Sequence, residues 1–75
     1  MTVKEFLEVI RDDDECCIHI KEQSSDWAFT VEGEAYNLQK MLKPVFLTAT
    51  VENIKEAFHP NGTPVHCISA EVIEV

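Results

Sequence analysis

Two stretches decide the fold: residues 16–21 read Cys-Cys-Ile-His-Ile-Lys, and residues 27–32 read Trp-Ala-Phe-Thr-Val-Glu. Apolar and polar side chains alternate in both, which is typical of strands with one buried face. In the first strand the alternation separates two faces, Cys16, Ile18 and Ile20 against Cys17, His19 and Lys21. The polar residues 22–26 between the stretches predict a turn. We therefore expect an antiparallel hairpin with a shared apolar face, and we expect Trp27 and Phe29 to lie in the core.

A short helix is predicted before this hairpin. Thr2 and Glu5 have the spacing of a capping box, in which each residue's side chain accepts a hydrogen bond from the other's backbone. The apolar residues that follow have the spacing of one helical face, Val3, Phe6, Leu7 and Ile10. A second short helix is expected over residues 36–42, between Gly33, which should break the second strand, and Pro44, which should stop the helix.

The C-terminal third contains a strong turn signal, His-Pro-Asn-Gly-Thr-Pro at residues 59–64. One interpretation is a second hairpin with arms 45–58 and 65–75. Ile54 and Phe58 break the alternation of the first arm, and a bulge near Glu52 or Asn53 would restore it. The other interpretation is a helix over residues 51–58, capped by Thr50. We favour the hairpin, although the pattern leaves both open.

Together these elements predict a single α+β domain over residues 1–75. The expected architecture is an antiparallel sheet of about four strands in two hairpins, with the N-terminal helix and the second short helix packed on one face. A chain of this length buries only about 60% of its unfolded surface. Self-association is therefore one way in which the protein would gain further burial.

The net charge of the chain indicates which classes of partner it can bind. Fourteen acidic residues face six basic ones, which gives a formal net charge of -8. Such a surface repels phosphate backbones and anionic lipid, so we expect no nucleic-acid or membrane ligand. A basic protein surface is the favoured partner. The densest acidic run supplies the candidate contact residues, Asp12, Asp13, Asp14 and Glu15. A simpler explanation is that the charge only keeps the protein soluble.

The cysteine and histidine side chains indicate one alternative function, the binding of zinc or another transition metal by a Cys/His set. Its candidate ligands are Cys17, His19, His66 and Cys67. The spacing argues against it, because no pair has the two-residue gap of a zinc knuckle or ribbon. The cysteines number three, an odd count that favours reduced thiols over a disulfide framework. We expect a protein that is not an enzyme and has no cofactor, since no catalytic constellation is present.

The N-terminal residues and the apolar runs indicate where in the cell the protein is expected. Glu5 and Glu8 interrupt any signal-peptide core, and no apolar run approaches the roughly 20 residues that span a bilayer. We therefore expect a cytoplasmic protein. Because no catalytic or cofactor site is expected, the leading hypothesis for the function is a non-enzymatic, acidic protein-interaction module.

The order of four segments also resembles a known group of sequences. These segments are V-K-E-F-L-E-V-I, C-I-H-I-K, W-A-F-T-V-E-G and the closing I-S-A-E-V-I-E-V. In this order they resemble small uncharacterised proteins encoded by phages and prophages of Gram-positive bacteria. The resemblance implies a phage or mobile-element origin, but that group has no known activity to transfer. The Pro-Asn-Gly-Thr-Pro turn and the adjacent Cys16 and Cys17 depart from its pattern.

Overall fold

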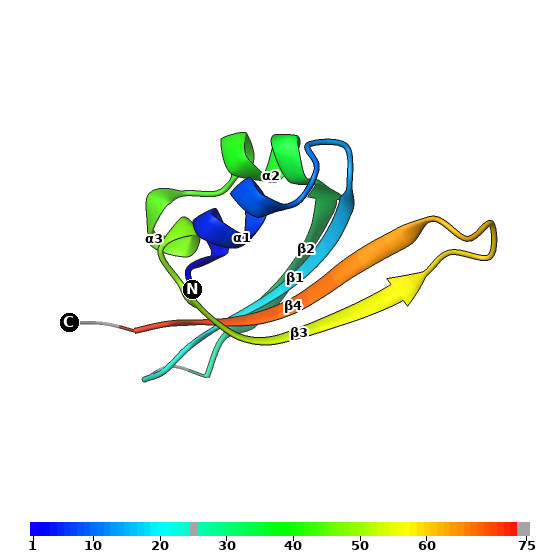
Figure 1. Cartoon of the computed structure of the whole chain (residues 1–75). Helices are drawn as coiled ribbons and strands as arrows, with labels where there is room; N and C mark the ends of the chain where they lie inside the picture. The colour runs from blue at the N-terminus through cyan, green and yellow to red at the C-terminus, as the bar shows by residue number, and fades with distance from the viewer. Residues whose placement is uncertain (25, 74–75) are drawn as a thin grey trace.

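The structure, a computed structural model, describes residues 1–24 and 26–73 (Figure 1). Along the chain the elements are α1 (Val3–Val9), β1 (Glu15–Glu22), β2 (Ala28–Glu34), α2 (Ala35–Met41), α3 (Pro44–Leu47), β3 (Thr50–Phe58) and β4 (Pro64–Val72). The three helices lie over one face of a four-stranded sheet, and the other face is left open. The predicted α+β class is confirmed.

The sheet is mixed, which corrects the prediction of a purely antiparallel one. Its strand order is β2-β1-β4-β3, so two antiparallel hairpins meet where β1 runs parallel to β4. After β2 the chain crosses the sheet through α2 and α3 and returns along the far edge as β3. The next turn then places β4 beside β1 in the same direction. Ile18 lies opposite Ile68, and Ile20 lies opposite Ala70. The two most apolar strands therefore become the central ones.

Local sequence features determine where the helices begin. The Thr2 backbone N–H donates to Glu5 Oε1 at 2.9 Å, and the Glu5 N–H donates to Thr2 Oγ1 at 3.2 Å. This is the predicted capping box, and it starts α1. Helix α2 matches the second predicted helix within a residue. Helix α3 was not predicted, because Pro44 was taken only as a stop signal. The fixed φ of proline also suits a first helical position, and Pro44 takes that role here.

The second hairpin is present, with a shorter first arm than expected. Residues 50–58 form a strand and not a helix, and a register shift between Val51 and Asn53 brings Ile54 opposite Ile68. The bulge predicted near Glu52 or Asn53 is thus confirmed. Residues 45–47 belong to α3 and not to this arm. Two predicted segments include residues outside the described part of the chain. The arm 65–75 includes residues 74 and 75, and the turn 22–26 includes residue 25.

Gly33 does not break the second strand, which continues to Glu34. A Cβ atom at Gly33 would lie 3.4 Å from Leu38 Cδ2. Leu38 of α2 thus lies within van der Waals distance of this position in the strand that precedes the helix. This packing brings the first turn of α2 over the end of the β1–β2 hairpin.

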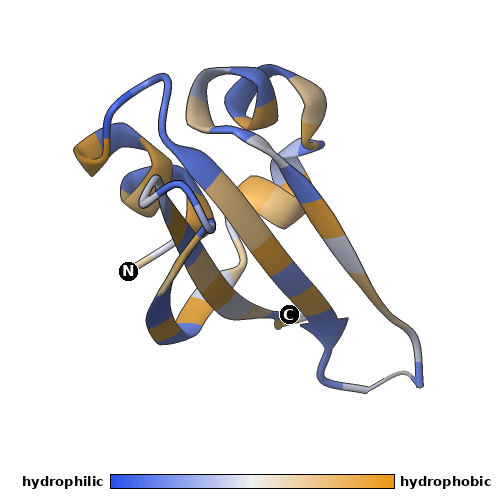
Figure 2. Ribbon diagram, turned by 90° about the vertical axis from the view of Figure 1, so that its right-hand side faces the viewer, coloured by the Kyte–Doolittle hydropathy of each residue, from blue (hydrophilic) through white to orange (hydrophobic). Residues whose placement is uncertain are grey.

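The core lies between the helices and the covered face of the sheet. Figure 2 shows the alternating bands of apolar and polar residues along the strands that produce it. The largest fully buried side chains are Leu7, Ile18, Ile20, Leu38, Val3 and Cys16. Trp27 departs from its predicted core position, because 40% of its surface is exposed. It precedes β2 and stacks on Phe29, with ring centroids 5.8 Å apart, at the margin of the core.

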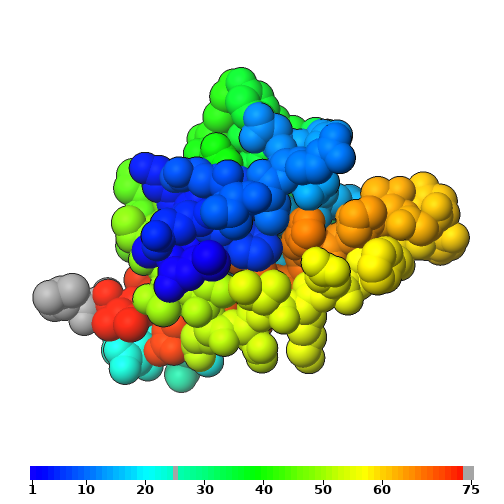
Figure 3. Space-filling view, in the orientation of Figure 1, coloured from blue at the N-terminus to red at the C-terminus, as the bar shows by residue number. Residues whose placement is uncertain are grey.

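The β3–β4 hairpin extends beyond the helices, and the molecule measures 41 × 21 × 18 Å along its principal axes. Figure 3 shows the hairpin turn standing away from the body of the protein. Phe58, near this turn, is 66% exposed, and Ile54 is 51% exposed. The outer half of β3 thus lacks the helical cover that the other strands have.

Three isoleucines in one row across the sheet give a test of this architecture. Ile18 is fully buried, whereas Ile54, two strands away on the same face, is half exposed. We expect Ile18→Ala to lower the free energy of unfolding by about 2–5 kcal/mol, because it removes a buried side chain and leaves a cavity. Ile54→Ala should lower it by less than about 1 kcal/mol. Urea unfolding measures both, and equal losses would contradict the placement of the helices.

Candidate functional site

The structure gathers carboxylates at one end of the β1–β2 hairpin. The predicted acidic run occupies the turn between α1 and β1 and the first residue of β1. The strand register then adds two more carboxylates, because Glu34 lies opposite Glu15 and Glu32 lies opposite Cys17. We call this surface the acidic end, and it consists of Asp12, Asp13, Asp14, Glu15, Glu32 and Glu34.

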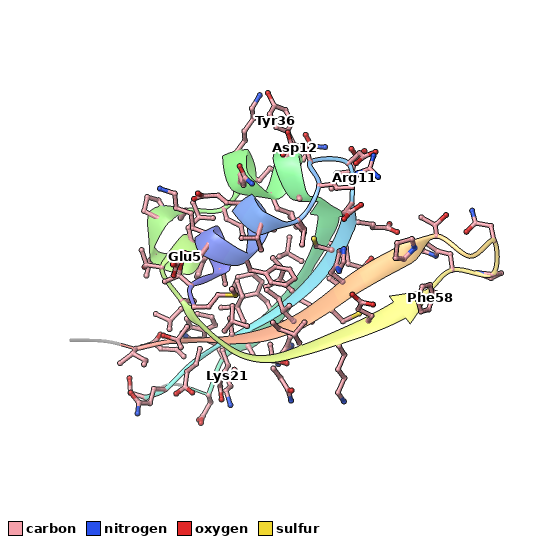
Figure 4. All side chains as sticks on the ribbon, in the orientation of Figure 1. Glu5, Arg11, Asp12, Lys21, Tyr36 and Phe58 are labelled. Carbon is pink, nitrogen blue, oxygen red and sulfur yellow. The ribbon has the colours of Figure 1, made fainter. Side chains whose placement is uncertain are left out.

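The first turn of α2 holds the acidic turn in place. The Ala35 N–H donates to the Asp14 carbonyl oxygen at 2.9 Å, and the Tyr36 N–H donates to the Asp12 carbonyl oxygen at 3.0 Å. Figure 4 shows Asp12 beside Tyr36, with Arg11 next to it on the same loop. Two of the backbone donors of the helix start, which have no partner inside the helix, are thereby satisfied. The acidic turn is consequently fixed relative to the sheet.

Two members of the acidic run are engaged by histidines of the second hairpin. Asp14 Oδ2 lies 3.0 Å from His66 Nε2, and the Glu15 carboxylate contacts His59 Nε2. The side chains of His66 and Asp14 are only 13% and 21% exposed. These contacts span the β1–β4 junction, so they connect the acidic turn to the projecting hairpin.

The other two members of the run face solvent. Asp12 and Asp13 are both exposed, and Asp13 makes an ion pair with Arg11, with 3.7 Å between Arg11 Nε and Asp13 Oδ1. Glu32 and Glu34 are exposed as well. The four predicted contact residues therefore divide into a pair that histidines contact, Asp14 and Glu15, and a solvent-facing pair, Asp12 and Asp13.

The environment of Asp14 favours its ionised form. The hydrogen bond from His66 is the main cause that lowers the pKa of the Asp14 carboxyl, and the Arg11 backbone N–H also lowers it. Partial burial acts in the opposite direction but is outweighed. Asp14 is thus a charged anchor for the hairpin at neutral pH.

The open face of the sheet carries small and polar side chains. In Figure 4 Lys21 projects from it, on the side of the sheet away from the helices. A depression of about 200 Å³ lies on this face, lined by residues that include Cys17, His19, Thr30, Cys67 and Ser69. The His19 Nδ1 atom lies 3.1 Å from Thr30 Oγ1. The depression is below the roughly 300–1,000 Å³ typical of small-molecule sites.

The four candidate metal ligands do not converge. Cys17, His19 and Cys67 line the depression on the open face. His66 lies on the covered face, where its ring meets the edge of Phe6 at a centroid distance of 6.0 Å. Within residues 1–24 and 26–73 no group of three or more His, Cys, Asp or Glu side chains is arranged to hold an ion.

The remaining cysteine, Cys16, is buried among the core residues, as its register with Ile18 predicted. Burial is the main cause that raises the pKa of its thiol to about 11, and the nearby Asp14 charge adds to the effect. Cys16 therefore stays a neutral thiol and serves as a core residue.

Comparisons with protein-family models, with curated proteins and with solved structures gave no match. The resemblance to phage-encoded proteins thus stays a prediction from the sequence. Among the described residues, no helix has the length and apolar character needed to cross a bilayer.

Part of the candidate site was not predicted from the sequence. Glu32 and Glu34 join the acidic end only through the strand register, and His59 and His66 reach it only through the parallel pairing. The hairpin prediction was a usable signal for the two glutamates, because an antiparallel pairing of the two predicted strands brings the end of the second strand beside the start of the first. No local pattern indicated the histidine contacts, since 44 and 52 residues separate the partners.

The Asp14–His66 contact makes a prediction about acid titration. We expect the pKa of Asp14 to rise towards its ordinary value in His66→Gln, because the hydrogen bond that favours the carboxylate is weakened. In the wild type the folded pKa is lower than the unfolded one, near 4. The contact therefore contributes stability above about pH 4 and loses it as the pH falls through the folded pKa.

The measurement is an NMR titration of the Asp14 carboxyl carbon. His59→Gln is the matched control, because His59 contacts Glu15 and not Asp14. An unchanged Asp14 titration in His66→Gln, or an equal rise in His59→Gln, would refute the assignment.

Proposed function

We propose that this protein is a non-enzymatic interaction module that presents its acidic end to a basic surface of a partner protein. The observation that carries the proposal is the assembly of six carboxylates from a turn and two strands onto one end of the sheet. Arg11 lies among them, but its side chain is already paired with Asp13. The acidic end thus has a predominantly negative field, which would steer a basic partner and weaken with added salt.

The contact residues of this proposal are the exposed ones. Asp12 and Asp13 face solvent, whereas Asp14 and Glu15 are used to hold the second hairpin. The backbone hydrogen bonds from α2 fix the turn before any partner arrives. A preformed surface loses less conformational entropy on binding, which favours recognition by this turn.

The free edge of β3 supports a second contact, either with a partner strand or with another copy of the chain. Residues 52–58 of β3 are exposed, while the first residues of the strand are covered by the N-terminus, with Val51 N–H donating to the Met1 carbonyl oxygen at 2.8 Å. Unpaired backbone groups at such an edge accept an added strand. The charged residues Glu52, Lys55 and Glu56 oppose indiscriminate pairing and favour a partner of complementary charge.

Two features favour an interaction module over an enzyme or a metal protein. The depression on the open face is small for a substrate. The Cys/His set, the basis of the metal-binding alternative, is divided between the two faces of the sheet. The proposal includes a cytoplasmic location and no nucleic-acid ligand, which rest on the net charge and on the sequence.

The test compares two variants with the same change in net charge. Asp12→Asn with Asp13→Asn removes two negative charges from the acidic end. Asp26→Lys changes the net charge by the same amount at the turn of the β1–β2 hairpin, at the opposite end of these strands. Immobilised wild type and variants are incubated with lysate of the source organism at low and physiological salt, and bound proteins are quantified by mass spectrometry.

We expect a basic protein that binds the wild type and Asp26→Lys and is retained about fivefold less by the double variant, since each exposed charge contributes roughly 0.2–1 kcal/mol. Circular dichroism verifies that all three proteins are folded. Equal retention by the double variant would show that Asp12 and Asp13 are not contact residues.

A further inference from the structure

Two thiols face each other across the β1–β4 junction. Cys17 of β1 and Cys67 of β4 are direct partners in the parallel register, so their side chains emerge on the same, open face. Adjacent strands lie about 4.8 Å apart. Disulfides join residues whose Cα atoms are about 4.4–6.8 Å apart. The backbone already holds the two cysteines at a separation that a disulfide requires.

Both thiols are within reach of a small reagent. Cys17 and Cys67 are partly exposed, and both line the depression of about 200 Å³ on the open face. The Cys17 thiol donates to Glu32 Oε1 at 3.7 Å. Burial, followed by the nearby Cys67 and Glu32, raises the pKa of the Cys17 thiol. Cys67 is therefore close enough to influence Cys17 directly.

The third cysteine cannot easily replace either partner. Cys16 is adjacent to Cys17 in sequence, but its side chain points into the core on the covered face. Its thiol has a pKa raised to about 11, so little thiolate is present at neutral pH. The geometry selects one pair out of the three that three cysteines allow.

We propose that Cys17 and Cys67 are a redox pair, which a low-molecular-weight disulfide such as oxidised glutathione converts reversibly into a cross-strand disulfide. One thiolate attacks the small disulfide, and a mixed disulfide forms while one small thiol leaves. The second protein thiolate attacks the mixed disulfide at the protein sulfur and expels the other small thiol. The protein loses two electrons and two protons, and the small disulfide is reduced to two thiols.

The bond would join the two hairpins covalently. Strand pairing connects the hairpins only between β1 and β4 in the described sheet, so the disulfide closes the chain from residue 17 to residue 67 across that junction. Closing a loop of this length restricts the unfolded chain. We expect oxidation to raise the Tm by about 10 °C or more, and excess small thiol to reverse the rise.

The test uses the full chain in glutathione buffers of increasing oxidised fraction, followed by alkylation and intact mass spectrometry. We expect the wild type to lose two hydrogens and to fall from three alkylated thiols to one. The background variant Cys16→Ala should fall from two to none and keep the Tm rise. Cys17→Ser and Cys67→Ser should form no internal disulfide and should show only mixed disulfides with glutathione.

Peptide mapping of the oxidised wild type identifies the bond without any substitution, so the test does not depend on how the variants fold. Cys16 and Cys17 are adjacent and share one peptide. The supporting result is therefore a crosslinked peptide whose fragmentation places the bond between Cys17 and Cys67 and the alkyl label on Cys16. For the wild type, three alkylated thiols in the most oxidising buffer, a stable mixed disulfide or a disulfide-linked dimer would overturn the proposal. A Cys16–Cys17 bond in Cys67→Ser would also overturn it.

Discussion

The parallel pairing of β1 with β4 is the constraint on which the rest of the structure depends. Each hairpin alone is a two-stranded ribbon, which is marginally stable in water. Their union places Ile18 and Ile20 beside Ile68 and Ala70, and so provides a continuous apolar face on which the helices pack. The same pairing brings the histidines of the second hairpin to the acidic turn and sets the open-face thiols side by side. The core, the histidine contacts of the acidic turn and the dithiol are thus consequences of one strand contact.

The local elements of the fold were largely predictable, because each carries its own signal within a few residues. The capping box at Thr2, the alternation of β1 and the turn at residues 59–64 each depend on neighbours in sequence. The parallel pairing was not predictable in this way, because it joins strands about 50 residues apart and leaves no local pattern. Helix α3 was missed for a different reason, since Pro44 serves equally well to end one helix and to begin another.

The candidate site was predictable only in part, for the same reason. The run from Asp12 to Glu15 is visible as composition, but composition does not reveal that Asp14 and Glu15 are occupied by histidines. Cys17 and Cys67 were considered as metal ligands together with His66, and the register separates His66 from them by placing it on the other face. The sequence thus shows which residues are charged, whereas the side chains that contact each charged residue depend on the assembled sheet.

The position of β4 in the chain also has a consequence for synthesis on the ribosome. Both strands of the first hairpin emerge well before residues 64–72, yet β1 needs β4 as its second neighbour. Until that strand leaves the exit tunnel, one edge of β1 and the apolar side chains of Ile18 and Ile20 lack their final partners. Such a nascent chain exposes an aggregation-prone strand, and it completes its core only when the most distant contacts form. The decisive folding step therefore waits for residues 64–72, and a pause in translation before residue 64 would prolong the vulnerable state.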